Sequence, residues 1–173
     1  MENLTKRLTA KNIAVMGLLL AGQIILTNLL SYQVLTLRIS FTFIATYLLA
    51  AWFGPLLGGI GSVLSDLLGT VLFSKGGTFF WGFSLSAFLG AFFYGLVFYK
   101  KPFTLPRIII AVLINVVVID LLLNTFWLVL MYQSPWTIIY ARAIKDLILI
   151  PIQIILLYIV GNNKQIQRLG KRL

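Results

Sequence analysis

Long apolar stretches separated by short connectors occupy most of this sequence. The first stretch, residues 12–31, holds 20 residues and follows a polar, basic start. At about 1.5 Å per residue, a helix of that length spans about 30 Å, the thickness of a hydrocarbon core. Lipid offers no hydrogen-bond partners, so each stretch must satisfy its own backbone, as a helix does. We predict an all-α integral membrane protein, a bundle of six transmembrane helices at about residues 12–31, 39–53, 56–73, 79–99, 108–131 and 136–160.

The composition agrees with a single membrane domain over residues 1–173. Hydrophobic residues make up 60% of the chain and charged residues 10%, against about 25% charged in soluble domains. The sequence has no cysteine and no histidine, which removes disulfides, thiolate nucleophiles and the common zinc sites. We therefore expect no metal, no cofactor and no enzymatic activity. No phosphate-binding Walker motif occurs either, so an ATPase that drives this protein would be a separate chain.

Basic residues indicate the orientation in the membrane. The chain carries a net charge of +10, and most basic residues fall on one side of the six-span arrangement. The positive-inside rule makes that side cytoplasmic, so we expect both termini, 1–11 and 161–173, in the cytoplasm, and no nucleic-acid binding. The residues on that side are Lys6, Arg7, Lys11, Lys100, Lys101, Arg107, Lys164, Arg168, Lys171 and Arg172.

Four basic residues depart from this rule and lie toward the outer half. Arg38 and Lys75 fall in outward connectors, and Arg142 and Lys145 lie inside the sixth stretch on one helical face. A charge at membrane depth is costly and marks a functional site. The four would suit an anionic ligand that enters from outside, because arginine grips carboxylates with two prongs. Alternatively, Asp146 at i+4 pairs internally with Arg142, and Lys75 is an ordinary loop lysine.

Buried acids suggest a second kind of contact. Asp66 lies in the third stretch, and Asp120 lies in the fifth, with Asn124 at i+4 and Trp127 at i+7. An acceptor, an amide and an indole on one stripe would suit a heterocyclic ring. Most aromatics near the outer ends are expected to form an interfacial belt, with Trp81 and Trp127 as candidate exceptions. The alternative is that Asp66 and Asp120 pair with basic residues of neighbouring helices.

Small residues recur at four-residue spacing on several stretches and permit close helix contact. In the first stretch, Gly17 and Ala21 form such a pair. Because this helix begins the bundle, its small-residue face is a candidate contact for a partner protein.

Five runs of the sequence carry a resemblance to a known family, at residues 37–41, 53–59, 66–69, 76–86 and 141–146. The chain, over most of its length, resembles the substrate-binding (S) components of energy-coupling factor (ECF) transporters, and more narrowly the folate-specific group.

This resemblance implies a six-helix bundle in a bacterial plasma membrane that binds a vitamin at its outer side. It also implies partners, namely a transmembrane coupling protein and two ATPases. The family's Ala-xxx-Ala stripe on the first helix, which contacts the coupling protein, is matched here by Gly17 and Ala21. Gly17 in place of the first alanine is one departure from the family's pattern. Ala45 is another, because the resemblance leads us to expect proline there.

The hypothesis from sequence is therefore a high-affinity folate-binding S component. The pterin ring would meet Asp66, Asp120, Asn124, Trp81 and Trp127. The glutamate carboxylates would meet the four outer basic residues. Three alternatives stay open: an S component for riboflavin, thiamine or pantothenate, a small intramembrane enzyme acting on lipid phosphates, and a structural membrane subunit.

Overall fold

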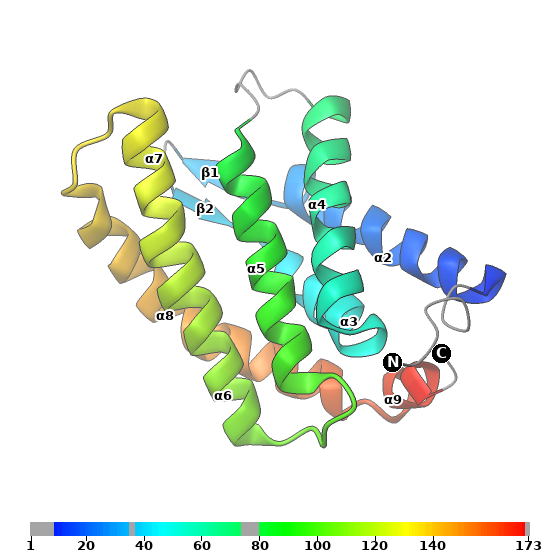
Figure 1. Ribbon diagram of the computed structural model, residues 1–173. Coiled ribbons are helices and arrows are strands. Elements are labelled where there is room, and N and C mark those ends of the chain that lie inside the picture. The colour runs from blue at the N-terminus through cyan, green and yellow to red at the C-terminus, as the bar shows by residue number, and fades with distance from the viewer. Residues whose placement is uncertain (1–8, 35–36, 74–79, 172–173) are drawn as a thin grey trace.

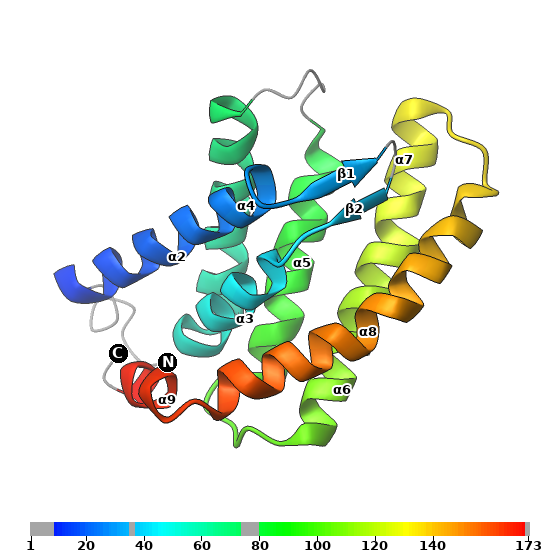
Figure 2. The same ribbon diagram turned by 180° about the vertical axis from the view of Figure 1, so that it is seen from behind.

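Helices dominate the fold, as Figures 1 and 2 show from opposite sides. The structure is a computed structural model that describes residues 9–34, 37–73 and 80–171. The helices are α2 (Ala10–Asn28), α3 (Thr42–Phe53), α4 (Pro55–Leu72), α5 (Trp81–Phe98), α6 (Leu105–Leu113), α7 (Thr125–Tyr132), α8 (Ile138–Asn162) and α9 (Lys164–Lys171), with a π-helix, η1 (Ile114–Asn124), between α6 and α7.

Among the described residues, five helical segments are long and apolar enough to cross a membrane. They are Ala10–Asn28, Pro55–Leu72, Trp81–Phe98, Leu105–Met131 and Ile138–Asn162, and the apolar helix Thr42–Phe53 is shorter. Each coincides broadly with one of the predicted stretches. The fifth combines α6, η1 and most of α7, so a helix read from sequence as uniform contains 11 residues of π-helix.

A short antiparallel hairpin departs from the all-α prediction. Strands β1 (Tyr32–Val34) and β2 (Leu37–Ile39) pair Tyr32 with Ile39, and Gln33 with Arg38. Ile39 therefore ends a strand instead of beginning the second predicted span. Three residues per strand are too few for the alternating pattern of strands to stand out in the sequence. In Figure 2 the hairpin crosses in front of α5 toward α7.

Glycine and proline set the sharp joint between α3 and α4. Gly54 has a φ of 93°, a conformation that strains residues with a side chain. Pro55 then occupies the first turn of α4, where its missing N–H costs nothing. The joint lets α3 fold back beside α4, and both helices also contact α5.

The core is aromatic and lies where α3, α5, α6 and α8 meet. The Tyr47 ring packs edge-on against Phe98 with centroids 4.9 Å apart, and against Tyr94 at 6.4 Å. Ile108 and Leu157 close this core from α6 and α8 and are fully buried.

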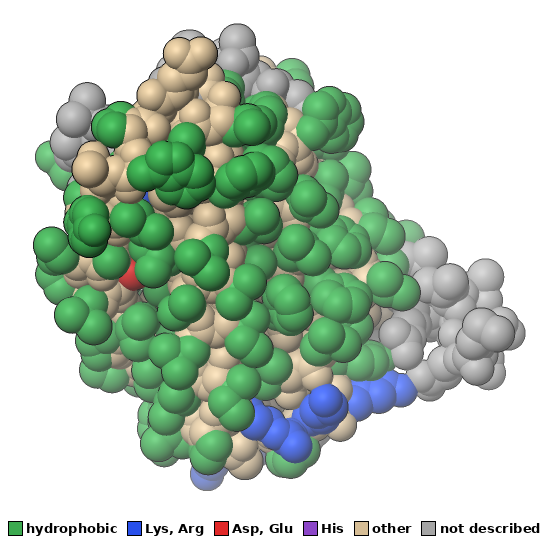
Figure 3. All heavy atoms as spheres, turned by 60° about the vertical axis from the view of Figure 1, so that its left-hand side comes forward, with side chains coloured by type: hydrophobic (Ala, Val, Ile, Leu, Met, Phe, Trp, Pro, Cys, Tyr) green, Lys and Arg blue, Asp and Glu red, His purple; other side chains and the backbone are tan. Residues whose placement is uncertain are grey.

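The outer surface is mostly apolar, as a lipid-facing surface must be. Figure 3 shows one face covered by hydrophobic side chains, with Lys and Arg gathered at its lower edge. Figure 1 shows the turn between α5 and α6 and helix α9 at the lower end, and the hairpin toward the upper end.

Glycines let α4 approach its neighbours closely. A Cβ on Gly95 of α5 would lie 2.4 Å from the Pro55 Cα, and one on Gly58 would lie 2.8 Å from the Ala50 Cα. These neighbours are backbone atoms, which cannot rotate away as a side chain can. Glycine at these positions is therefore a packing requirement.

We predict that Gly95→Ala destabilises the fold. Forcing a methyl group into the Pro55 backbone should cost about 1–3 kcal/mol, as overpacking does elsewhere. The measurement is the melting temperature of the purified protein in detergent. Gly22→Ala is the control, because a Cβ there meets nothing within 4 Å. Equal melting temperatures for the two variants would contradict the close contact between α4 and α5.

Candidate ligand-binding site

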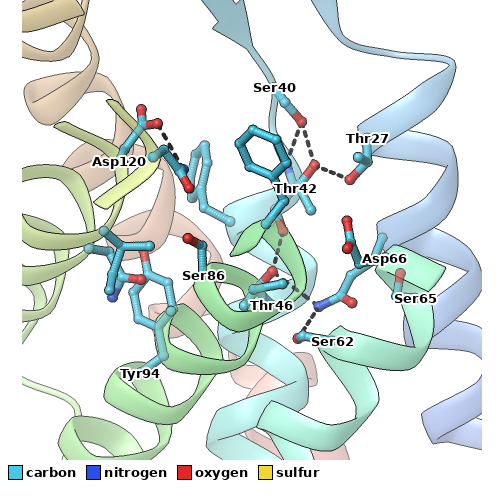
Figure 4. Close-up of a pocket in the computed structure, with 18 of the residues that line it drawn as sticks. Thr27, Ser40, Thr42, Thr46, Ser62, Ser65, Asp66, Ser86, Tyr94 and Asp120 are labelled. Atoms are coloured by element: carbon cyan, nitrogen blue, oxygen red, sulfur yellow. Dashed lines mark hydrogen bonds between the residues drawn. The ribbon is translucent and has the colours of Figure 1, made fainter. Parts of the chain in front are cut away.

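A cavity of about 380 Å³ lies among α2, α3, α4, α5 and η1, and two residues of α8 also line it. Its size falls within the range of small-molecule sites, about 300–1,000 Å³. Figure 4 shows polar side chains from these elements converging on it. A position between helices is typical of ligand sites in helical bundles.

Hydroxyl groups line the side of the cavity nearest the hairpin. Thr27 of α2 and Thr42 of α3 share a hydrogen bond of 2.8 Å between their side-chain oxygens. Ser40, which directly follows β2, bonds to Thr42 and donates to the Leu26 carbonyl at 3.0 Å. These bonds tie the end of the hairpin to α2 and α3 (Figure 4).

Gln23 joins three helices on the α2 side of the cavity. Its amide nitrogen donates to Thr46 Oγ1 of α3 at 3.0 Å and to Ser62 Oγ of α4 at 3.1 Å. The side chain is 2% exposed, so these bonds have little competition from water. Gln23 is one of three buried residues of α2, with Asn12 and Ile24, and its two hydrogen bonds link α2 to α3 and α4.

Asp66 of α4 is held by a residue of α5, and Ser86 of α5 is held by a residue of α7. Ser84 Oγ donates to Asp66 Oδ2 at 2.7 Å. The Trp127 indole N–H donates to Ser86 Oγ at 3.1 Å, and the Trp127 ring packs against Phe80. Asp66 and Ser86 line the cavity, whereas Trp127 lies behind Ser86 and positions it.

Asp120 of η1 is the centre of a charge cluster whose other charged members, Arg142, Lys145 and Asp146, are buried. Its Oδ1 lies 2.7 Å from Arg142 Nη2, and its Oδ2 lies 2.7 Å from Lys145 Nζ. Arg142 also donates to the Asp120 backbone carbonyl at 2.9 Å, and Asn124 donates to Asp120 Oδ1 at 3.3 Å. Lys145 Nζ lies 2.9 Å from Asp146 Oδ1 as well. Two cations and two anions thus balance where lipid surrounds the bundle.

The cavity wall itself is acidic. Asp66 and Asp120 line it, as does Asn124, but no lysine or arginine is among the described lining residues. Arg142 and Lys145 are 4% and 9% exposed and lie behind Asp120. The structure therefore places these two predicted ligand contacts in an ion-pair network. Arg142 pairs with Asp120, whereas Asp146, the partner of Arg142 considered from sequence, lies 2.9 Å from Lys145 Nζ.

Three other predicted residues have different outcomes. Trp81 shares an outer helical face with Leu85, and its side chain is 69% exposed, while Gly82 and Ser86 take the inner face. Trp81 is thus placed at the surface and not at the cavity. Lys75 lies outside the described residues. Arg38 belongs to β2, and its side chain is likewise outside the described part.

Sequence reasoning missed much of the cavity wall. Gln23, Phe43, Phe83, Tyr94 and Asn115 all line it. Gln23 and Asn115 are uncharged amides inside apolar stretches, and that rarity was the available signal. The aromatic residues carried none, because the chain is rich in them.

An apolar helical bundle around a polar cavity is typical of membrane proteins that bind small molecules. The chain belongs to a family within that class, the substrate-specific components of ECF transporters, whose family model matches residues 11–161.

Curated relatives and a solved structure agree with this assignment. The chain is 39% identical to the folate transporter FolT of Clostridium novyi (strain NT), over 89% of this chain and 88% of that protein. It is 31% identical to the folate transporter FolT of Leuconostoc mesenteroides, over 100% of this chain and 99% of that protein. A crystal structure of FolT bound with folic acid superposes with a TM-score of 0.84 at 41% identity, covering 89% of this chain and 94% of that one.

We predict that Asp120→Asn destabilises the bundle. The substitution would leave Arg142 and Lys145 with Asp146 as their remaining acidic neighbour in the cluster. Breaking a buried ion pair costs about 3–5 kcal/mol. Because the Asp120 side chain is 35% exposed, we expect about 3 kcal/mol, measured as a loss of melting temperature in detergent.

A second substitution makes this test specific. Lys145→Met combined with Asp120→Asn should recover part of the lost stability, because it removes one uncompensated cation. Lys101→Met, at an exposed position, should recover none in the same background. Wild-type stability in Asp120→Asn would show that the cluster does not hold η1 to α8.

Proposed function

We propose that the protein is a folate-binding S component of an ECF transporter. The observation that carries this proposal is a polar, acidic cavity inside a chain 41% identical to a FolT bound with folic acid. No covalent chemistry is required, and the related proteins are named transporters. The alternative of an enzyme acting on lipid phosphates has no such support.

The wall of the cavity suits the ring and linker of a folate. Carboxylates accept hydrogen bonds, and a folate offers donors in its ring amino group, its ring N–H and the N–H groups of its linker. Asp66, fixed by Ser84, is the proposed acceptor for one of these donors. Phe43 and Phe83 add apolar surface against which a flat ring can pack.

The glutamate tail must lie away from these acids, since its own carboxylates would be repelled. Arg38 and Lys75 are the proposed contacts for the tail, on the grounds given by the sequence. Support for this position comes from Ser40, two residues after Arg38, which lines the cavity. Arg142 and Lys145 then act on the ligand indirectly, by holding Asp120 in the wall.

We also propose six membrane spans in the plasma membrane with both termini in the cytoplasm. In the described part of the chain, five helices meet the length and hydropathy of a span, and Thr42–Phe53 is a shorter sixth apolar helix. The gathering of basic side chains at one end in Figure 3 supports the orientation. The hairpin would then lie toward the outer side.

Helix α2 supports the proposed contact with the coupling protein and its two ATPases. Gly17 and Ala21 are exposed, and a Cβ on Gly17 would meet nothing within 4 Å. Ala14 continues the same exposed face. The opposite face of α2 carries Gln23, so the helix contributes to the cavity and to this small-residue surface at once.

We predict that micromolar folic acid raises the melting temperature and quenches tryptophan fluorescence. Trp127 should report binding, because it bonds to Ser86 in the wall. Asp66→Asn should weaken the Kd at least tenfold, about 1.4 kcal/mol, through loss of a charged acceptor. Leu68→Ala, exposed on the same helix, is the control.

Two results would overturn the folate proposal. One is the lack of any response of the folded protein to folic acid. The other is a tighter response to riboflavin, thiamine or pantothenate, which would make it an S component for that vitamin. Unchanged affinity in Asp66→Asn, with binding otherwise intact, would remove Asp66 from the site.

Bulky residues on α2 should separate binding from assembly. We predict that Gly17→Leu with Ala21→Leu abolishes co-purification with the coupling protein and ATPases but leaves the Kd for folic acid unchanged. Steric loss of close helix contact is the reason. Val71→Leu, at an exposed position of α4, should co-purify normally. Retained co-purification of the double variant would place the partner elsewhere.

A further inference from the structure

Tyr94 presents an unusual feature in the cavity wall. Its side chain is 2% exposed, yet its hydroxyl oxygen has no hydrogen-bond partner among the described residues. Leaving a buried hydroxyl unpaired costs about 1–3 kcal/mol, so such a group calls for an explanation. Tyr94 lines the cavity, and Figure 4 shows it on the side of Ser86 and Asp120, across from Asp66.

Asn115 of η1 supplies a neighbouring polar group with a fixed orientation. Its Nδ2 donates to the Ala111 carbonyl at 3.0 Å, which sets which way the amide points. The Oδ1 atom lies beside Gly90, where a Cβ would come within 2.9 Å of it. Tyr94, Asn115 and Gly90 all line the cavity.

This part of the wall therefore offers a hydroxyl donor and an amide acceptor. A cyclic amide presents the complementary pair, because its C=O accepts and its N–H donates. The pterin ring of a folate has such an edge, formed by its 4-oxo group and the adjacent ring N–H. Buried polar groups of a site discriminate strongly against ligands that leave them unpaired.

We infer that Tyr94 and Asn115 bind the cyclic amide edge of the ligand ring, with the Tyr94 hydroxyl donating to the oxo group and Asn115 Oδ1 accepting from the N–H. This inference rests on the proposed folate binding and makes Tyr94 a specificity-determining residue. It assigns the hydroxyl its missing partner. It also orients the ring toward Tyr94, and the anionic tail away from it.

The test compares folic acid with aminopterin, in which an amino group replaces the 4-oxo group. That change turns the acceptor into a donor and removes the ring N–H. The wild type should bind folic acid at least tenfold more tightly. Tyr94→Phe should weaken folic acid about tenfold and change aminopterin less than twofold, so that the ratio of the two Kd values falls toward one.

Matched variants separate recognition from packing. Tyr47→Phe removes another buried hydroxyl, on a ring that packs 6.4 Å from Tyr94 but does not line the cavity, and it should keep the wild-type ratio. Asn115→Ser should also lower the ratio. Pteroic acid, which lacks the glutamate, should lose as much affinity in Tyr94→Phe as folic acid does, because the contact is with the ring.

The outcomes distinguish this inference from the proposed function. Folic acid binding with an unchanged ratio in a folded Tyr94→Phe protein would overturn the role of Tyr94 alone. Equal weakening of both ligands would overturn it as well, since a packing defect acts on both. Absence of folic acid binding in the wild type would overturn both proposals.

Discussion

The ion pairs between Asp120 and the two cations of α8 are the interaction on which the site depends. Arg142 and Lys145 are buried in a bundle whose outer surface is apolar, so their charges must be balanced inside the protein. Asp120 provides that balance at 2.7 Å to each, and Asp146 completes a neutral group of four. The same contacts hold η1 against α8 and fix one wall of the cavity. Because the two cations lie behind Asp120, the described residues that line the cavity are acidic or uncharged.

Hydropathy was enough to locate the apolar helices, because an apolar stretch of this length has few alternatives in lipid, but it did not indicate α9 in the polar tail. It could also find Asp66, Asp120 and Asn124, since polar residues inside apolar stretches are rare and all three line the cavity. It could not determine partners. Whether Arg142 faces Asp120 or a ligand depends on the rotation of α8 about its axis and on the contacts of η1. Those relations join residues 22 positions apart, which no local pattern encodes.

The hydroxyl groups that line the cavity near the hairpin could not be predicted from the sequence either. Thr27, Ser40 and Thr42 are small residues that occur in any membrane helix or turn, and their types alone predict nothing. They become a site because the hairpin brings Ser40 onto α2 and α3. Trp81 illustrates the converse, since tryptophan suggested a ring-binding surface, but the helical face shared with Leu85 turns it outward.

The π-helix has a consequence for how the fifth span fits the bilayer. A continuous α-helix of the 27 residues Leu105–Met131 would be about 40 Å long, longer than a hydrocarbon core of about 30 Å. In η1 each hydrogen bond encloses an additional residue, so more residues fit into the same rise. The wider turns shorten the helix toward the membrane thickness and reduce the hydrophobic mismatch that would otherwise require tilting. The π-helical geometry that presents Asp120 and Asn115 to the cavity thus also brings the length of the helix closer to the thickness of the bilayer.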